Sequence, residues 1–269
     1  MSRSPNSQED VAAGPRFAVV GIPGNRRVTL FAEAVQAAGL PKPRILPWAG
    51  VLGGGARFHP GETVRIDSPG EDREVDRVLR GVDDLTRVEG TGRWYRAFTA
   101  AAAALADSAK ASGAALLDDP GELAVLFDKR LCHGVLAAAG VPVPHSPTSG
   151  RNAPRPRGWR EVRELMRSAG IPRAFVKPAH GSSASGVIAL ETGGPRGAIR
   201  ATTSVELSPD GRLFNSLRVR TYRTEAEIAR IVDTLAPDGL HIEQWIPKAA
   251  QSGRSADLRV VVVGGRATH

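Results

Sequence analysis

One stretch of this chain combines a lysine with a loop of small residues. Residues 175–190 read FVKPAHGSSASGVIAL, an apolar run that ends in Lys177 and Pro178, then a polar loop and a second apolar run. This pattern predicts a strand, a loop and a strand, which together form a β-hairpin. Small residues let backbone N–H groups approach phosphate oxygens, and the lysine adds a positive charge for the same anion. We therefore expect the hairpin to hold the phosphates of a nucleotide.

The two common glycine motifs for phosphate binding are absent from this chain. No Gly-Lys-Ser/Thr follows the loop, which excludes a Walker P-loop. The turn after the first predicted strand reads Gly21-Ile22-Pro23-Gly24, and Pro23 stands where a dinucleotide fingerprint needs its second glycine. A hairpin loop without any ligand is the alternative interpretation. A lysine in a strand that otherwise reads as buried favours an anion, because a buried unpaired charge is costly.

Three further segments follow a known pattern in the same order along the chain. They are residues 127–130 (FDKR), which open a helical run that ends before VPVP at 141–144, residues 242–247 (IEQWIP) and residues 257–265 (DLRVVVVGG). With the hairpin, they resemble the ATP-grasp superfamily, the fold of glutathione synthetase, D-alanine–D-alanine ligase and the RimK-type glutamate ligases. The resemblance covers roughly residues 118–269. It implies ATP and Mg²⁺ as cofactors and a ligase that joins a carboxylate to an amine or thiol through an acyl-phosphate.

The resemblance also implies roles for single residues. Lys129 would reach the nucleotide from the helical side, and Lys177 would touch the α-phosphate and adenine N7. The loop from His180 to Gly186 would form a phosphate lid, and residues 243–246 would hold the adenine edge. The nucleotide-binding candidates are Lys129, Lys177, His180, Gly181, Ser182, Ser183, Gly186, Glu243, Gln244, Trp245, Ile246 and Asp257, and Arg259 is the catalytic candidate.

Some of these residues also have an ordinary structural interpretation. Asp257 would lie near the ribose or acceptor and Arg259 would face the transferred phosphate, but they alternate with Leu258 and could form an ion pair on a solvated strand face. Lys129 falls off the apolar face of its predicted helix, so it would be exposed and free to reach out. Glu243 could be a strand-end charge, Trp245 a core residue and His180 a chance loop residue.

Composition narrows the function classes. The formal net charge of +8 leaves a basic nucleic-acid binder as an alternative, although no RNP, zinc or basic-helix motif accompanies it. The lysines are Lys42, Lys110, Lys129, Lys177 and Lys248, so two of five stand at the ATP-grasp positions. Cys132 is the single cysteine, and His133 beside it is a weak metal signal. With no apolar leader and no apolar run of about 18 residues, we expect a cytoplasmic protein without a membrane segment.

The elements around these motifs predict an α/β fold with two domains. Residues 1–14 read as a disordered tail and residues 15–118 as an open α/β layer with strands at 16–20, 44–48, 63–66 and 114–117. Glycines at 53–55 mark a loop, Ser68 or Asp72 would cap a helix to Arg80, and residues 93–111 read as a long helix. Residues 119–269 would form the ATP-grasp α+β module, with one helix at 121–139 and a strand at 258–263.

The end of the chain sets a further expectation. In ATP-grasp enzymes the magnesium ligands lie downstream of the Asp-x-Arg strand, and this sequence ends at His269. We therefore expect no metal ligand set in this chain, an incomplete module and no ligase turnover by these residues alone. A non-catalytic nucleotide-binding module is the alternative from another class. The substrates would be a small-molecule or peptide carboxylate and an amine; the sequence does not identify them or the oligomeric state.

Overall fold

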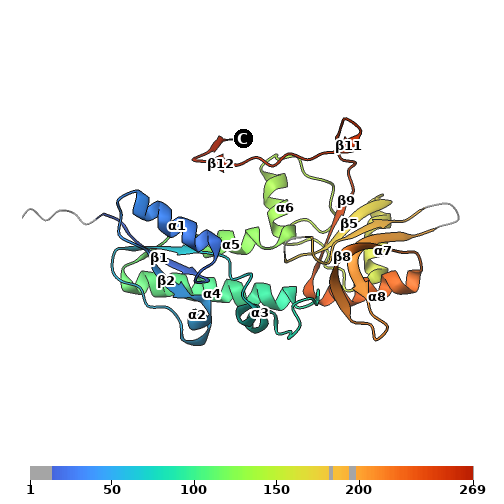
Figure 1. The fold of residues 1–269 in the computed structure, drawn as a ribbon. Coiled ribbons are helices and arrows are strands. Elements are labelled where there is room, and N and C mark those ends of the chain that lie inside the picture. Colours follow the sequence, from blue (N-terminus) through green and yellow to red (C-terminus); the bar gives the residue numbers. More distant parts are fainter. Residues whose placement is uncertain (1–13, 182–183, 194–197, 269) are drawn as a thin grey trace, which may run out of the picture.

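The structure, a computed structural model, describes residues 14–181, 184–193 and 198–268. The expected tail over residues 1–13 and the site candidates Ser182 and Ser183 lie outside this range. A parallel sheet in the N-terminal half and an antiparallel sheet in the C-terminal half lie side by side, with helix α4 (Thr91–Ser112) reaching from one toward the other (Figure 1). The expected α/β fold class is confirmed by these sheets and the helices packed on them.

The N-terminal sheet contains four parallel strands in the order β2-β1-β3-β4. These are β1 (Arg16–Gly21), β2 (Arg44–Pro47), β3 (Glu62–Ile66) and β4 (Ala115–Leu116). The last four residues of β1 are all buried, without the in–out alternation of a strand that faces water. Continuous burial is typical of an inner strand of a parallel sheet that is covered on both faces.

Four helices accompany this sheet, and their ends follow local signals. They are α1 (Arg26–Ala37), α2 (Trp48–Gly54), α3 (Arg73–Arg80) and α4 (Thr91–Ser112). Asp72, not Ser68, caps α3, because its carboxylate accepts the amides of Glu74 and Val75 at 2.9 and 3.0 Å. The loop predicted at Gly53–Gly55 is wrong in part, since α2 runs through Gly54 and ends where Gly55 has φ 81°.

The single helix expected over residues 121–139 is wrong, because the chain forms two helices there. α5 (Pro120–Leu126) and α6 (Lys129–Ala138) are separated at Asp128, whose backbone is extended. The Asp128 carboxylate accepts the amide of Arg130 at 2.9 Å and so caps α6. The break gives α6 its own direction and places Lys129 in its first turn, where the Lys129 amide donates to Ala179 O at 2.9 Å.

The C-terminal sheet contains five antiparallel strands in the order β8-β7-β6-β5-β9. These are β5 (Arg173–Pro178), β6 (Ile188–Glu191), β7 (Arg200–Leu207), β8 (Leu213–Tyr222) and β9 (Leu240–Gln244). Helices α7 (Trp159–Ser168) and α8 (Glu225–Leu235) cover one face, where Met166, Val176 and Ile231 share one apolar core. Alternation along β5 sends Ala174 and Val176 into this core and leaves Phe175 and Lys177 on the opposite face.

Contacts around α4 help to tie the halves together. The carboxylate of Asp238, in the short helix η2 (Ala236–Asp238), accepts the amides of Gly90 and Gly92 at 2.6 and 3.0 Å at the start of α4. The Tyr95 ring of α4 stacks on the His180 ring, with the ring centres 4.0 Å apart. The N-terminal half therefore packs against the segment that follows β5.

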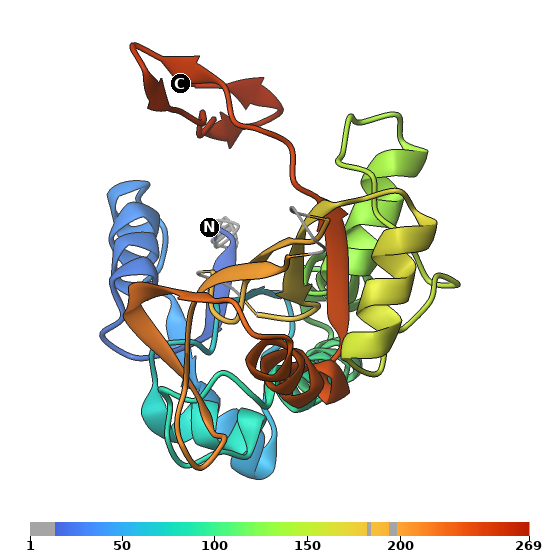
Figure 2. The ribbon, with the colours of Figure 1, turned by 90° about the vertical axis from the view of Figure 1, so that its right-hand side faces the viewer.

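The last residues lie apart from both sheets, at the top of the molecule in both views (Figures 1 and 2). They form two small hairpins, from β10 (Ala250–Gln251) with β11 (Arg254–Ser255) and from β12 (Val262–Val263) with β13 (Arg266–Ala267). The strand predicted at 258–263 is therefore wrong, since only its last two residues pair, and Leu258 is 93% exposed. Among the described residues, no helix is both long and apolar enough to cross a bilayer.

Candidate functional site

A cavity of about 300 Å³ lies where the predicted lysines meet the loop after β5. Strand β5, the start of α6 and the loop between β5 and β6 form its walls. The residues that line it are Lys129, Phe175, Lys177, Gly181, Ala184, Ser185 and Val187. The structure thus brings together Lys129, Lys177 and Gly181, which are far apart in the sequence.

Lys177 lies on the polar face of β5, next to Glu243 of the neighbouring strand. Its ammonium donates a hydrogen bond to Glu243 Oε1 and lies 5.4 Å from the centre of the Phe175 ring. The strand register explains this contact, because Lys177 is paired with His241 and Phe175 with Glu243 across β5 and β9. The positive charge of Lys177 is therefore partly neutralised at the cavity wall.

Glu243 is the best-partnered ionisable group at the site. Its Oε1 accepts from Lys177, and its Oε2 lies 3.3 Å from His241 Nε2. Burial alone would raise the pKa of Glu243, but the hydrogen bonds from His241 and Lys177 and their charges lower that pKa to about 2. The carboxylate is ionised, and both of its oxygens are engaged within the protein.

Lys129 differs from the exposed lysine that the sequence predicts. Its ammonium donates to the backbone oxygens of Pro178 at 3.1 Å and Gly181 at 2.8 Å. Burial, with the nearby positive charge of Lys177, lowers the pKa of Lys129 to about 8. The prediction of exposure is wrong because the break at Asp128 turns the first residue of α6 inward, toward the end of β5.

A group that the sequence analysis missed lies behind Glu243. His241 is 1% exposed, and its Nδ1 lies 3.2 Å from Oγ1 of Thr148, which is fully buried. Thr148 Oγ1 in turn accepts the amide of Ile242 at 2.8 Å. The spacing of His241 and Glu243 was a usable signal, because residues two apart in a strand share a face. Thr148 lies far off in the sequence and gave no such signal.

The loop between β5 and β6 depends on glycine at both ends. Gly181 has φ 104° and Gly186 has φ 73°, values that side chains disfavour. A Cβ on Gly186 would lie 2.7 Å from Cγ of Pro178, which closes the loop against the end of β5. His180 does not face the lysines: its ring stacks on Tyr95, and its Nδ1 lies 3.2 Å from Phe127 O.

The other hinge candidates lie past Glu243 at the end of β9. The Gln244 amide donates to His145 O at 2.8 Å and the Trp245 amide to Arg173 O at 2.9 Å. Trp245 is half-buried, and its ring centre is 5.2 Å from that of Phe175. Ile246 is 54% exposed. Trp245 therefore packs against a residue that lines the cavity.

The last two candidates do not line this cavity. Asp257 is exposed and pairs with Lys248 at 2.5 Å, and Arg259 is exposed on the same extended segment. Asp257 and Arg259 are thus placed on the outlying C-terminal segment rather than beside Lys129 and Lys177.

The donor set of the cavity suits an anion. Two lysine ammonium groups face it, and the two carboxylates nearest to them are engaged within the protein, Glu243 by Lys177 and His241 and Asp128 by Arg130. Within residues 14–181, 184–193 and 198–268, no group of three His, Cys, Asp or Glu side chains could hold a metal ion. The described residues therefore fit the phosphates of a nucleotide and do not fit a magnesium site of their own.

A second cavity, of about 490 Å³, lies on the other side of His180. Arginines from α4, α6 and the connector before α7 line it: Arg96, Arg130, Arg155 and Arg157. Arg130 forms a fork with Asp128, at 2.9 and 2.6 Å. Burial and the charge of Arg130 lower the pKa of Arg155, whose side chain donates to backbone oxygens of residues 150 and 151. This side of the site is also positively charged.

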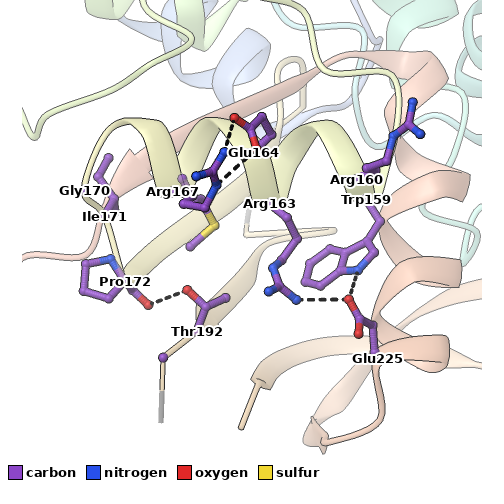
Figure 3. Close-up of a pocket in the computed structure, with 12 residues that line it drawn as sticks. Trp159, Arg160, Arg163, Glu164, Arg167, Gly170, Ile171, Pro172, Thr192 and Glu225 are labelled. Carbon is purple, nitrogen blue, oxygen red and sulfur yellow. Dashed lines mark hydrogen bonds and ion pairs between the residues drawn. The ribbon is translucent and has the colours of Figure 1, made fainter. Parts of the chain in front are cut away.

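A larger cavity, of about 790 Å³, lies along α7 and holds none of the predicted residues (Figure 3). Four of its charged side chains form two ion pairs: Arg163 with Glu225 at 3.0 Å and Arg167 with Glu164 at 2.7 Å. Trp159 also donates to Glu225, at 2.8 Å. These pairs satisfy both carboxylates of the cavity and leave Arg160 as its charged lining side chain without an ion pair among the described residues.

Comparison with known proteins returned solved structures and nothing else, since no protein-family model and no curated protein matched. Among the matched structures are complexes of the ATP-grasp ligase PsnB. One holds a minimal precursor (TM-score 0.43, 18% identity, 86% of this chain and 64% of that chain). A second holds a phosphomimetic variant of that precursor with Mg and ADP (TM-score 0.45, 18% identity, 86% and 65%). A third holds precursor peptide PsnA2 and AMPPNP (TM-score 0.41, 17% identity, 86% and 65%). This chain spans less than two thirds of the PsnB chains that it matches.

Proposed function

We propose that this chain binds ATP in the cavity between β5 and the start of α6, as part of a ligase that joins a carboxylate to an amine or thiol through an acyl-phosphate. One observation carries the proposal: Lys129 and Lys177 line one cavity with a loop of small residues. Ammonium groups and small-residue loops are the groups that bind phosphates. The order of the sequence motifs, which resembles the ATP-grasp superfamily, supports the same conclusion.

The geometry supports a division of roles within the nucleotide site. Lys177, fixed by Glu243, would bind the phosphates near the base, and Lys129 and the loop backbone would bind the phosphates farther along. The Glu243 carboxylate is already engaged, so the adenine edge would be bound by backbone groups around residues 244–246 other than the Gln244 and Trp245 amides, which donate to His145 O and Arg173 O. Phe175 and its neighbour Trp245 offer aromatic surface for the base. Magnesium, when bound, would neutralise the negative charge that develops on the phosphoryl group, and we assign it no ligand among the described residues.

The arginine-lined cavity suits the carboxylate substrate. Guanidinium groups bind carboxylates through two parallel hydrogen bonds, and Arg96 and Arg155 have no acidic ion-pair partner among the described residues. His180 lines this cavity and the next residue, Gly181, lines the lysine cavity, so the two cavities are separated by a short backbone segment. An activated carboxylate must lie beside the γ-phosphate, and this adjacency supports such a placement.

Calorimetry with ATP, ADP and GTP tests the nucleotide site. We expect ATP and ADP to bind folded protein and to raise its melting temperature, since a ligand specific for the native state stabilises it by about 2.7 kcal/mol at a hundredfold excess over Kd. Exposed Arg218, on the outer strand β8, supplies the control variant Arg218→Gln, which should bind like wild type. Folded protein that shows neither heat of binding nor a thermal shift with ATP would refute the proposal.

ADP release separates the ligase from a non-catalytic nucleotide-binding module. The assay pairs ATP and magnesium with a panel of carboxylates and amines, and it includes peptides because the PsnB structures hold precursor peptides. ADP release that depends on a carboxylate and an acceptor supports the ligase. Tight ATP binding without release under any pairing supports the binding module.

A further inference from the structure

Lys177 is the last member of a hydrogen-bond chain that begins at a backbone amide. The Ile242 amide donates to Thr148 Oγ1 at 2.8 Å, and Thr148 Oγ1 lies 3.2 Å from His241 Nδ1. His241 Nε2 lies 3.3 Å from Glu243 Oε2, and Glu243 Oε1 accepts from Lys177. The chain therefore links the connector before α7, strand β9 and strand β5.

Both ends of this chain can only donate, so Thr148 Oγ1 accepts from the Ile242 amide and Glu243 accepts from Lys177. A backbone amide and an ammonium carry protons and no lone pair, and an ionised carboxylate only accepts. Glu243 therefore needs a proton on His241 Nε2. Burial lowers the pKa of His241 and favours the neutral ring, so Nδ1 accepts the hydroxyl proton of Thr148 at 3.2 Å; Ser146 Oγ at 3.3 Å and Ile242 O at 3.4 Å lie slightly farther from that hydroxyl. The hydrogen bonds assign His241 to the tautomer with the proton on Nε2.

Among the described residues, the ring nitrogens of His241 have no other hydrogen-bond partner than Thr148 and Glu243. Thr148 is fully buried and His241 is 1% exposed, so water does not compete for their hydrogen bonds. His133 of α6 is the other ring that faces it, with ring centres 5.3 Å apart. The two nitrogens of His133 lie 2.8 Å from Ser149 Oγ and 2.8 Å from Pro144 O, so they are engaged elsewhere. The charged groups near His241 are Lys177 and Glu243.

We propose that His241 is a positioning residue, which holds Glu243 so that the Glu243 carboxylate anchors Lys177 at the cavity wall. The inference rests on the proposed ATP site and deepens it. A lysine side chain samples many rotamers when free, and a ligand that needs it in one place binds more tightly when it is already there. Without His241, the Glu243 side chain has no fixed partner on its buried side, and Lys177 loses its fixed anchor.

Two substitutions of His241 separate the positioning role from simple packing. In His241→Gln the side-chain amide nitrogen can take the place of Nε2 and still donate to Glu243. In His241→Asn the shorter amide can reach Thr148 but not Glu243. We expect His241→Asn to weaken ATP binding about tenfold, equivalent to about 1.4 kcal/mol, and His241→Gln to stay within about threefold of wild type. His145→Asn, at an exposed histidine of the neighbouring segment, is the control and should bind ATP like wild type.

A second measurement needs no nucleotide, so it distinguishes this inference from the proposed function. The acylation rate of Lys177 by an N-hydroxysuccinimide ester, followed by peptide mass spectrometry, reports how firmly the ammonium is held. We expect faster acylation in His241→Asn than in wild type or His241→Gln, and a nitrogen NMR spectrum of wild type that shows His241 protonated at Nε2. Equal acylation in the Asn and Gln variants, or a proton on Nδ1, would overturn the inference even if ATP binds. Absence of ATP binding together with the expected acylation pattern would refute the ATP site and leave the anchor supported.

Discussion

The two lysines of the cavity differ in how their surroundings compensate the positive charge. Lys177 stands on a strand pair and faces Glu243, which in turn is held by His241. Lys129 stands at the start of a helix, donates to two backbone oxygens, and has no carboxylate in hydrogen-bond contact among the described residues. One region therefore places a compensated charge with fixed geometry, and the other keeps a buried charge that is destabilised until an anion arrives.

The largest effect on ATP binding should come from Lys177→Met, which removes the ammonium group that is paired with Glu243. The substitution removes one charged hydrogen-bond donor and leaves the ionised Glu243 facing the phosphates. A hydrogen bond to a charged group contributes about 1.5–3 kcal/mol, so we expect ATP to bind about 10- to 100-fold more weakly. Calorimetric titration of ATP into the variant measures this loss.

Glu243 supplies the control for that experiment. If repulsion by its carboxylate contributes to the loss, the double variant Lys177→Met/Glu243→Gln should bind ATP more tightly than Lys177→Met alone. Wild-type affinity in Lys177→Met would remove Lys177 from the site. An unchanged affinity on adding Glu243→Gln would mean that the carboxylate does not reach the phosphates.

The position of Lys177 on its strand could be predicted from the sequence, and the position of Lys129 at the start of α6 could not. Alternation along residues 173–178 and along residues 240–244 tells which side chains of each strand share a face, so Lys177 and Glu243 could each be proposed for the site, and the pairing of β5 with β9 then brings them into contact. The position of Lys129 depends on a helix break at Asp128. The apolar periodicity of residues 121–139 continues across that break, so it predicts one helix. The hydrogen bond from the Asp128 side chain to the Arg130 amide competes with helix continuation over a single turn only, and the periodicity does not reveal it.

Contacts between distant segments account for the other differences between the predicted and the observed structure. The apolar run 258–263 has high strand propensity, but a strand needs a partner edge, and among the described residues only Val262 and Val263 find one. The long-range contacts of Thr148 with His241 and of Asp238 with the start of α4 join residues that share no local pattern. The fold class and the central hairpin were therefore predictable, while the approach of the two halves and the buried histidine were not.

A smaller effect is expected for Lys129→Met, which tests the uncompensated region. ATP should bind about tenfold more weakly, because one cation is lost but no unpaired carboxylate is exposed.

The stability of the nucleotide-free protein should also respond differently to Lys129→Met than to Lys177→Met. Between pH 8 and 10.5 the unfolded chain holds a proton at Lys129 more often than the folded protein does, so the free energy of unfolding of wild type rises with pH in this range. Below about pH 8 both states are protonated, and the full cost of the buried charge lowers the stability of the native state.

Chemical denaturation of the nucleotide-free protein measures that cost. At pH 7 we expect Lys129→Met to be at least as stable as wild type, and the stability advantage should shrink as the pH rises from 8 toward 10.5. Lys110→Met, at an exposed lysine of the last turn of α4, is the matched control and should show no such pH dependence. A clear loss of stability at pH 7 in Lys129→Met alone would mean that the ammonium stabilises the free protein.

The smallest signal, a proton taken up with the nucleotide, tests the same region without changing the affinity of the site. The pKa of Lys129 is about 8 in the free protein, where burial and Lys177 disfavour its charge. Phosphate oxygens beside the ammonium would favour the charged form and raise that pKa. At pH 8 the free protein carries this proton about half of the time, so binding should take up about half a proton per nucleotide. Calorimetry with ADP in two buffers of different ionisation enthalpy gives this number, and ATP affinity should fall as the pH rises above 8. The uptake should vanish in Lys129→Met and persist in Lys110→Met. A wild-type uptake that survives in Lys129→Met would assign the proton to another group and place Lys129 outside the reach of the phosphates.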